Sequence, residues 1–277
     1  MIDKSLSRGL ADRVLDQMAG LGMVYVAGCN RALRSFPRKR HSVKAVAEEM
    51  VAAGERCCLT QIVGSHPKWR WTSTCAFVPE IHTLPNCANN RTIAFRAVRT
   101  FSHVDRVTLI GNDSSIPLAI QEHAVERLFM RLNVQDAAAV REEMHDAMCL
   151  AIPVLGACRD LGLCQVVLPS RSGAFLCSLD PDGRSLVART WIPKSDEPCR
   201  HSAVIQVIEK FHAESGGERG IAAEICSLPI DAPLDAFVPA ASLVRSLDRI
   251  AWLKEPYSPR PDPVGKAWRD ARLQAAA

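Results

Sequence analysis

Three side chains suited to a phosphodiester are spaced along one expected helix, residues 117–132. His123, Arg127 and Arg131 recur every four residues, so a helix places them on a single ridge, with Glu126 beside them. Guanidinium groups bind phosphate through paired hydrogen bonds, and an imidazole exchanges a proton near neutral pH. The spacing therefore predicts phosphate binding and acid–base chemistry. The ordinary alternative is a solvated helix face on which Glu126 pairs with an arginine.

The expected strand 185–192 supplies two further candidates, Arg189 and Thr190. Neighbouring residues of a strand point to opposite faces, so these two side chains diverge unless the strand bulges between them. We expect Arg189 to be the residue that acts beside the helix. Ordinary strand propensity is the alternative explanation for Thr190.

The order of these pieces resembles that of the RelE/BrnT-like toxins, which belong with barnase and EndoU to a wider group of small ribonucleases. The matching residues, all within 117–193, are His123, Ala124, Arg127 and Arg131, then Leu168-Pro-Ser-Arg-Ser-Gly173-Ala-Phe, then Arg189-Thr190-Trp191. The resemblance implies cleavage of RNA without a metal or cofactor, with His123 as general acid or base. It also implies that Arg127 and Arg131 hold the scissile phosphate, and that Arg189 and Thr190 complete the site.

Charge is distributed unevenly along the chain. Residues 1–110 hold 16 Lys and Arg against 8 Asp and Glu, a net charge of +8, whereas residues 111–277 hold 18 against 22, a net charge of −4. A basic region can bind a polyanion, and aromatic rings beside it can stack on bases. The candidate nucleic-acid-binding residues are Arg31, Arg34, Arg38, Lys39, Arg40, Trp69 and Trp71. The alternative is a solvated basic loop.

Cysteine and histidine also cluster in one stretch, at Cys57, Cys58, His66, Cys75, His82 and Cys87. Structural zinc sites use closely spaced pairs such as C-x2-C or H-x3-5-H, and this stretch has none. We therefore expect buried thiols and loop histidines there, and no metal. Cys199 and His201 are neighbours too, but the sequence around them offers no oxyanion loop.

The composition excludes several classes of protein. With 48% hydrophobic and 23% charged residues, the chain is expected to be globular rather than disordered or collagen-like. The 11 cysteines without an export signal are expected to be reduced thiols in the cytoplasm. The apolar runs are too short to span a bilayer, so no membrane partner is expected.

The order of expected elements indicates an α+β fold, with helices packed on one antiparallel sheet and helical N- and C-terminal extensions. Glycines are expected to end the first helix near residue 22, and Pro153 to end the helix that begins at residue 137. Three prolines make residues 64–90 a long loop, with an edge strand near 73–78. The expected regions are a basic, mainly helical 1–90, a ribonuclease-like α+β core at 91–193, and a helical 194–277 with a Pro-rich linker and tail.

Two functions follow as expectations. The first is a toxin-like bacterial domain that binds or cleaves RNA without a metal, through His/Arg acid–base chemistry and phosphate holding. The second is a non-catalytic component of a larger bacterial or phage assembly, which binds nucleic acid or protein. A neutralising or assembly protein is the candidate partner beside RNA.

Overall fold

The computed structural model describes most of the chain: residues 2–39, 61–65, 71–83, 91–103, 106–111, 116–194, 199–229, 232 and 234–256. Several candidate nucleic-acid-binding residues fall outside this description. Arg40 and Trp69 lie outside the described residues altogether. The backbone is described, but not the side chain, for Arg31, Arg34, Arg38, Lys39 and Trp71.

Helices and strands occupy largely separate segments, which confirms the expected α+β fold. The helices are α1 (Lys4–Lys39), α3 (Glu122–Leu132), α4 (Ala137–Leu161), α5 (Ser202–Glu214), α6 (Gly217–Ser227) and α7 (Ala241–Asp248), with the 3-10 turns η1 (Leu234–Ala236) and η2 (Ala251–Lys254). The strands are β1 (Gln61–Ser65), β2 (Trp71–Thr83), β3 (Arg91–His103), β4 (Arg106–Gly111), β5 (Leu118–Gln121), β6 (Gln165–Pro169), β7 (Gly173–Leu179) and β8 (Leu186–Pro193).

The described strands form one sheet in the order β1-β2-β3-β5-β8-β7-β6, and β4 also pairs with β3. Neighbouring strands are antiparallel with one exception, because β5 runs parallel to β8 between Leu118↔Leu186 and Ile120↔Ala188. The sheet is therefore mixed rather than purely antiparallel. β2 and β3 pair over the whole of β2, so the expected boundary at residue 90 falls between two strands of the same sheet.

The prediction of a long loop at residues 64–90 is wrong, because β2 occupies much of that range. The predicted edge strand is also wrong, because β2 lies between β1 and β3. Pro79 is compatible with this position for a local reason. β1 pairs only with Thr72–Ala76, so among the described strands Pro79 has a partner on one side alone. A residue without an N–H costs little where no second strand needs a donor.

α1 and α4 both continue through residues that were expected to end them. Gly22 does not stop α1. A Cβ at Gly22 would lie 2.2 Å from the carbonyl oxygen of Pro79, so the glycine lets the helix approach β2. α4 continues past Pro153 to Leu161 because Val154 and Leu155 are buried. Burying such side chains gains about 1.5–3 kcal/mol each, which offsets the roughly 3 kcal/mol cost of a helical proline.

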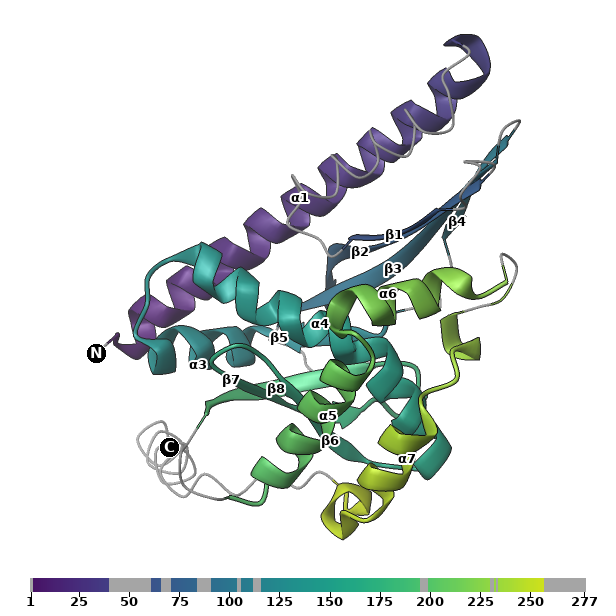
Figure 1. Cartoon of the computed structure of the whole chain (residues 1–277). Helices are drawn as coiled ribbons and strands as arrows, with labels where there is room; N and C mark the ends of the chain where they lie inside the picture. Colours follow the sequence, from purple (N-terminus) through teal and green to yellow (C-terminus); the bar gives the residue numbers. More distant parts are fainter. Residues whose placement is uncertain are drawn as a thin grey trace.

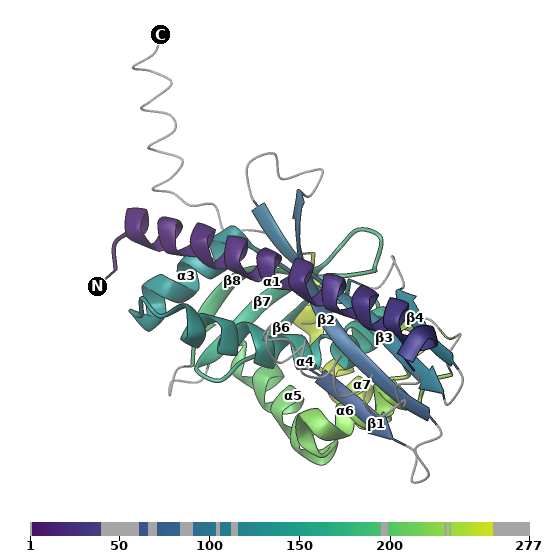
Figure 2. The same ribbon diagram turned by 90° about the horizontal axis from the view of Figure 1, so that it is seen from above.

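The core lies between the sheet and the helices. α1 contacts both β2 and α3, and α4 contacts β6 and β7, so the two long helices cover different parts of the sheet (Figure 1). Figure 2 shows α1 crossing above the sheet from α3 to the β2–β4 end. Trp191 is fully buried, and its indole Nε1 donates to Ser170 Oγ at 3.2 Å. Within the described residues, no helix has the length and apolarity needed to cross a membrane.

Candidate functional site

The ridge expected on residues 117–132 lies on α3, which begins at Glu122 directly after β5. His123 is flanked by two charged side chains: its Nδ1 lies 3.3 Å from Glu126 Oε2, and its Nε2 accepts a hydrogen bond from Arg127 Nε at 3.3 Å. Glu126 is nearly buried, whereas the His123 side chain is 42% exposed. We call Glu126, His123 and Arg127 the α3 group.

The partners of His123 suit one tautomer of its ring. With the proton on Nδ1, the ring donates to Glu126 Oε2 and accepts from Arg127 at Nε2. This arrangement orients a neutral imidazole as a base at Nε2, with a guanidinium beside it that can bind an anion. The structure therefore brings together two of the expected site residues, His123 and Arg127, and adds Glu126 as the group that orients the ring.

Arg131, expected to contact phosphate, lies against the backbone of β8 in the structure. Its guanidinium donates to the backbone carbonyl of Trp191, and its burial, together with Arg127 nearby, lowers its pKa. β5 pairs with β8 only as far as Ala188, so the later part of β8 has no described strand on that side. Arg131 satisfies a carbonyl that a strand would otherwise bind.

A bulge interrupts the pairing of β7 with β8 at Arg189, so Arg189 and Thr190 do not follow the regular alternation of a strand. Leu176 pairs with Thr190 and Cys177 pairs with Ala188, which leaves Arg189 without an opposite residue. Arg189 Nε donates to Ser178 Oγ at 3.0 Å. This hydrogen bond is made to β7 rather than to α3. Within the described residues, no hydrogen bond or ion pair links Arg189 or Thr190 to the α3 group.

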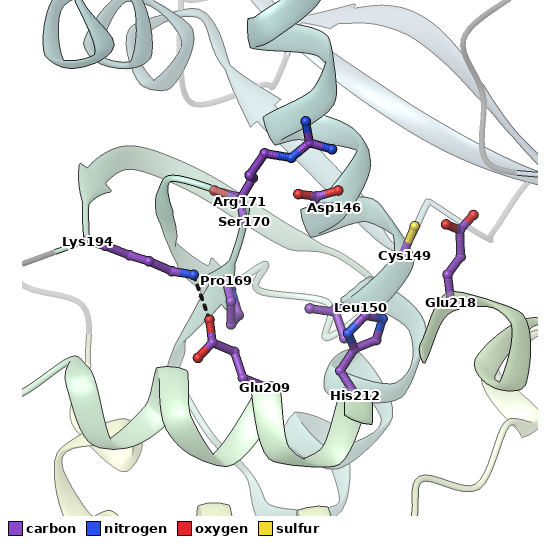
Figure 3. A pocket seen from close by; sticks show the side chains of 10 residues that line it. All are labelled: Asp146, Cys149, Leu150, Pro169, Ser170, Arg171, Lys194, Glu209, His212 and Glu218. Carbon is purple, nitrogen blue, oxygen red and sulfur yellow. Dashed lines mark ion pairs between the residues drawn. The ribbon is translucent and has the colours of Figure 1, made fainter. Parts of the chain in front are cut away.

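A second group of titratable side chains surrounds a cavity of about 260 Å³ between α4, α5, α6 and the end of β6. Cys149, His212 and Glu218 lie at one end of it, and the ion pair of Lys194 and Glu209, 2.8 Å long, lies at the other (Figure 3). His145 lies one helical turn before Cys149 on α4. Among the described residues, His145, Cys149 and Glu218 form a group whose candidate ligand atoms all lie within 4.8 Å of one another.

His145 is surrounded by acidic groups and sulfur. Its Nδ1 lies 3.8 Å from Asp146 Oδ1 and 3.9 Å from Cys149 Sγ, and its Nε2 lies 3.7 Å from Glu218 Oε1. Asp146 above all, and then Cys149, raise the pKa of His145 to about 10, although burial opposes the rise. The direction of this shift indicates a strongly negative local potential around the imidazole.

Local structure explains how these residues meet. His145 and Cys149 are four residues apart on α4 and so share one face. Gly216 and Gly217 both have positive φ, at 78° and 68°, and they turn the chain from α5 into α6 so that Glu218 faces His145. The four-residue spacing of His145 and Cys149 is visible in the sequence, but Glu218 meets them only through the fold.

The expected Cys–His pair at Cys199 and His201 is present on the surface. Cys199 Sγ lies 4.0 Å from His201 Nδ1, and the hydrogen bond to Ser202 is the main reason that the thiol pKa is lowered. Burial lowers the pKa of His201, whose ring stacks edge-on against Trp252.

The other expected cluster is mostly beyond the described part of the chain. Cys57, Cys58, His66 and Cys87 lie outside it, and of Cys75 only the backbone in β2 is described. His82 is described, and its Nε2 lies 3.3 Å from Glu80 Oε2. The prediction that this stretch binds no metal stays a prediction.

Comparison with known proteins found no match for the chain among protein-family models, curated proteins or solved structures.

Proposed function

We propose that the chain binds RNA and cleaves it at the α3 group without a metal, as a toxin-like ribonuclease. One observation carries this proposal: an exposed imidazole held between a carboxylate on Nδ1 and a guanidinium on Nε2. That arrangement combines a proton acceptor with an anion-binding group at a single position on the surface.

The chemistry follows from these three side chains. When Arg127 turns from His123 Nε2 to the phosphate, the freed Nε2 lone pair takes the proton of a ribose 2′-hydroxyl, and the 2′-oxygen attacks the adjacent phosphorus. The bond from phosphorus to the 5′-oxygen breaks, the imidazolium or water returns a proton to that oxygen, and a 2′,3′-cyclic phosphate remains. Arg127 binds the phosphate oxygens as their charge rises, and Glu126 keeps the proton on Nδ1. None of these steps uses Arg131 or Arg189, whose hydrogen bonds go to Trp191 and Ser178.

The exposure of His123 favours a polymer over a small molecule as substrate. Small ligands are usually enclosed by a cavity, whereas His123 and Arg127 lie on the partly exposed side of a helix whose other side is buried against the core. A flexible single strand can lay its backbone across such a ridge. The described cysteines carry thiols rather than disulfides, in keeping with the cytoplasmic location that the proposal assumes.

The test is cleavage of a single-stranded RNA by the purified full chain in EDTA. We expect His123→Ala and Arg127→Ala to lower the rate about 100-fold or more, and the products to end in 2′,3′-cyclic phosphate. His82→Ala is a matched control, because His82 also lies 3.3 Å from a glutamate and is 38% exposed. Circular dichroism in the same buffer checks that each variant is folded. Intact RNA with the wild type, or full cleavage by His123→Ala, would refute the proposal.

A second candidate is non-catalytic binding of nucleic acid, favoured by the charge of +8 on residues 1–110. α1 extends over 36 residues and carries basic residues to its end at Lys39. This function predicts affinity that falls steeply with salt and weakens when Arg38 and Lys39 are replaced by Gln. Equal affinity at low and high salt would exclude it.

A further inference from the structure

We propose that His145, Cys149 and Glu218 form a binding site for a divalent transition metal, with zinc as the natural occupant. The site is separate from the α3 group and does not depend on RNA cleavage. It joins α4, which carries the imidazole and the thiol, to the first turn of α6, which carries the carboxylate.

The spacing of the donor atoms fits a metal. One ligand atom from each of the three residues can be chosen so that all lie within 4.8 Å of one another. In a tetrahedral zinc site with bonds of about 2.0–2.3 Å, ligand atoms are separated by roughly 3.5 Å. The observed separations of up to 4.8 Å are therefore too wide by at most about 1.3 Å, a difference that side-chain rotations close.

The chemistry of the donors selects the class of metal. A thiolate and an imidazole bind borderline or soft ions, whereas magnesium and calcium prefer sites built from oxygen alone. Asp146 adds a second carboxylate beside His145, at 3.8 Å from Nδ1. Nε2 faces Glu218, whereas Nδ1 faces Asp146 and Cys149. A metal bound at Nε2 leaves the proton on Nδ1 for Asp146, which orients the ring, and draws Cys149 Sγ from Nδ1 toward the metal.

The cavity supplies the rest of the coordination sphere. Cys149 and Glu218 both line it, and His212 lies at the same end (Figure 3). Three protein ligands and a fourth position open to a cavity are the usual arrangement of zinc sites that keep a water molecule. Cys149 is only 7% exposed, so this position is reached through the cavity rather than from the outer surface.

The main alternative is a nucleophilic thiol. The imidazole of His145 lies between Cys149 and Glu218, as the histidine of a catalytic triad lies between the nucleophile and the acid. The position of Cys149 argues against it. Cys149 lies in the middle of the 25-residue α4, where backbone N–H groups are used by the helix itself. Those groups are therefore unavailable to stabilise an oxyanion, whereas metal binding requires only the side chains.

The test uses the full chain, stripped with a chelator and titrated with Co²⁺, whose bond to a thiolate gives a charge-transfer band in the near ultraviolet. We expect a band that saturates at one Co²⁺ per chain and is displaced by Zn²⁺. Cys149→Ser should abolish it, and Glu218→Gln and Asp146→Asn should weaken binding about 10-fold or more. Glu218 and Asp146 lie at the surface of the helices, so these two variants test the site even if Cys149→Ser is poorly folded.

Cys199→Ser is the matched control, because Cys199 also lies about 4 Å from a histidine but has no described carboxylate opposite it. The control should leave the band unchanged. Zn²⁺ should also raise the Tm of the wild type and not that of Glu218→Gln, since only the folded protein holds the site. No band with the wild type, or a band that survives Cys149→Ser, would overturn the proposal. Rapid alkylation of Cys149 that Zn²⁺ does not slow would overturn it in favour of the nucleophile.

Discussion

Replacing Gly22 by alanine is expected to destabilise the protein, although alanine is the better helix former. The new Cβ would lie 2.2 Å from Pro79 O and 3.3 Å from Pro79 Cδ, and the oxygen belongs to the backbone of β2. Ordinary contacts begin near 3.4 Å, so α1 and β2 must separate by about 1 Å at this point. Overpacking of this kind costs roughly 1–3 kcal/mol, which exceeds the gain in helix propensity of about 1 kcal/mol.

Gly20 offers a control on the same helix. A Cβ at Gly20 meets no atom within 4 Å, so Gly20→Ala gains helix propensity without a clash. We expect it to stabilise the protein by about 0.5–1 kcal/mol, which corresponds to a rise in Tm of roughly 1–4 °C for a chain of this size.

Urea denaturation followed by circular dichroism measures both changes. The two variants should move the transition midpoint in opposite directions with the slope unchanged. If Gly22→Ala stabilises the protein as much as Gly20→Ala does, then α1 does not approach β2 at Pro79. The account of why α1 continues through its glycines would then be wrong.

Three further predictions follow from the site. Arg131→Met should cost about 1–2 kcal/mol, because the carbonyl of Trp191 loses a charged donor, but it should leave the rate of RNA cleavage unchanged. In metal-free protein, His145 should stabilise the fold fully below its ordinary pKa of 6.5, and this contribution should disappear as the pH rises through about 10. Chemical denaturation from pH 6 to 10.5 should show this loss of stability, and the His145→Gln variant should lack the pH dependence. Iodoacetamide at neutral pH should label Cys199, whose thiol pKa is lowered, well before Cys158, where burial raises the pKa to about 12; peptide mass spectrometry distinguishes the two.

The strand β8 could be predicted from the sequence because local signals define it. Expected at 185–192, it lies within a residue of those bounds at Leu186–Pro193. The turn residues between β7 and β8 include Gly183, which has a φ of 66°. A glycine within a turn sequence indicates a position where the backbone can adopt a positive φ.

Where the observed helices and strands differ from the expected ones, the cause is packing between segments that are distant in the sequence. The sequence predicts a helix over residues 117–132, but Leu118–Gln121 form the strand β5. A short run of buried residues suits either structure until its neighbours are known. α1 and α4 run through Gly22 and Pro153 because contacts with distant segments outweigh local preference.

The site residues also fall into two kinds: those that local spacing brings together and those that only the fold brings together. Helical spacing was enough to place His123 beside Arg127. Whether Arg131 met a phosphate or a backbone carbonyl depended on where β5 ends relative to β8. Glu218 could not be assigned to His145, because the two come together only when α6 packs on α4.

The parallel pairing of β5 with β8 gives the sheet a seam. Three residue pairs, Leu118↔Leu186 to Ile120↔Ala188, join the half made of β1–β5 to the half made of β6–β8. Antiparallel neighbours form as local hairpins, but this ladder closes only after the whole intervening chain has been placed, at a large cost in loop entropy. We therefore expect the seam to form after the hairpins on either side of it and to open before them, which amide hydrogen exchange along β5 and β8 would measure.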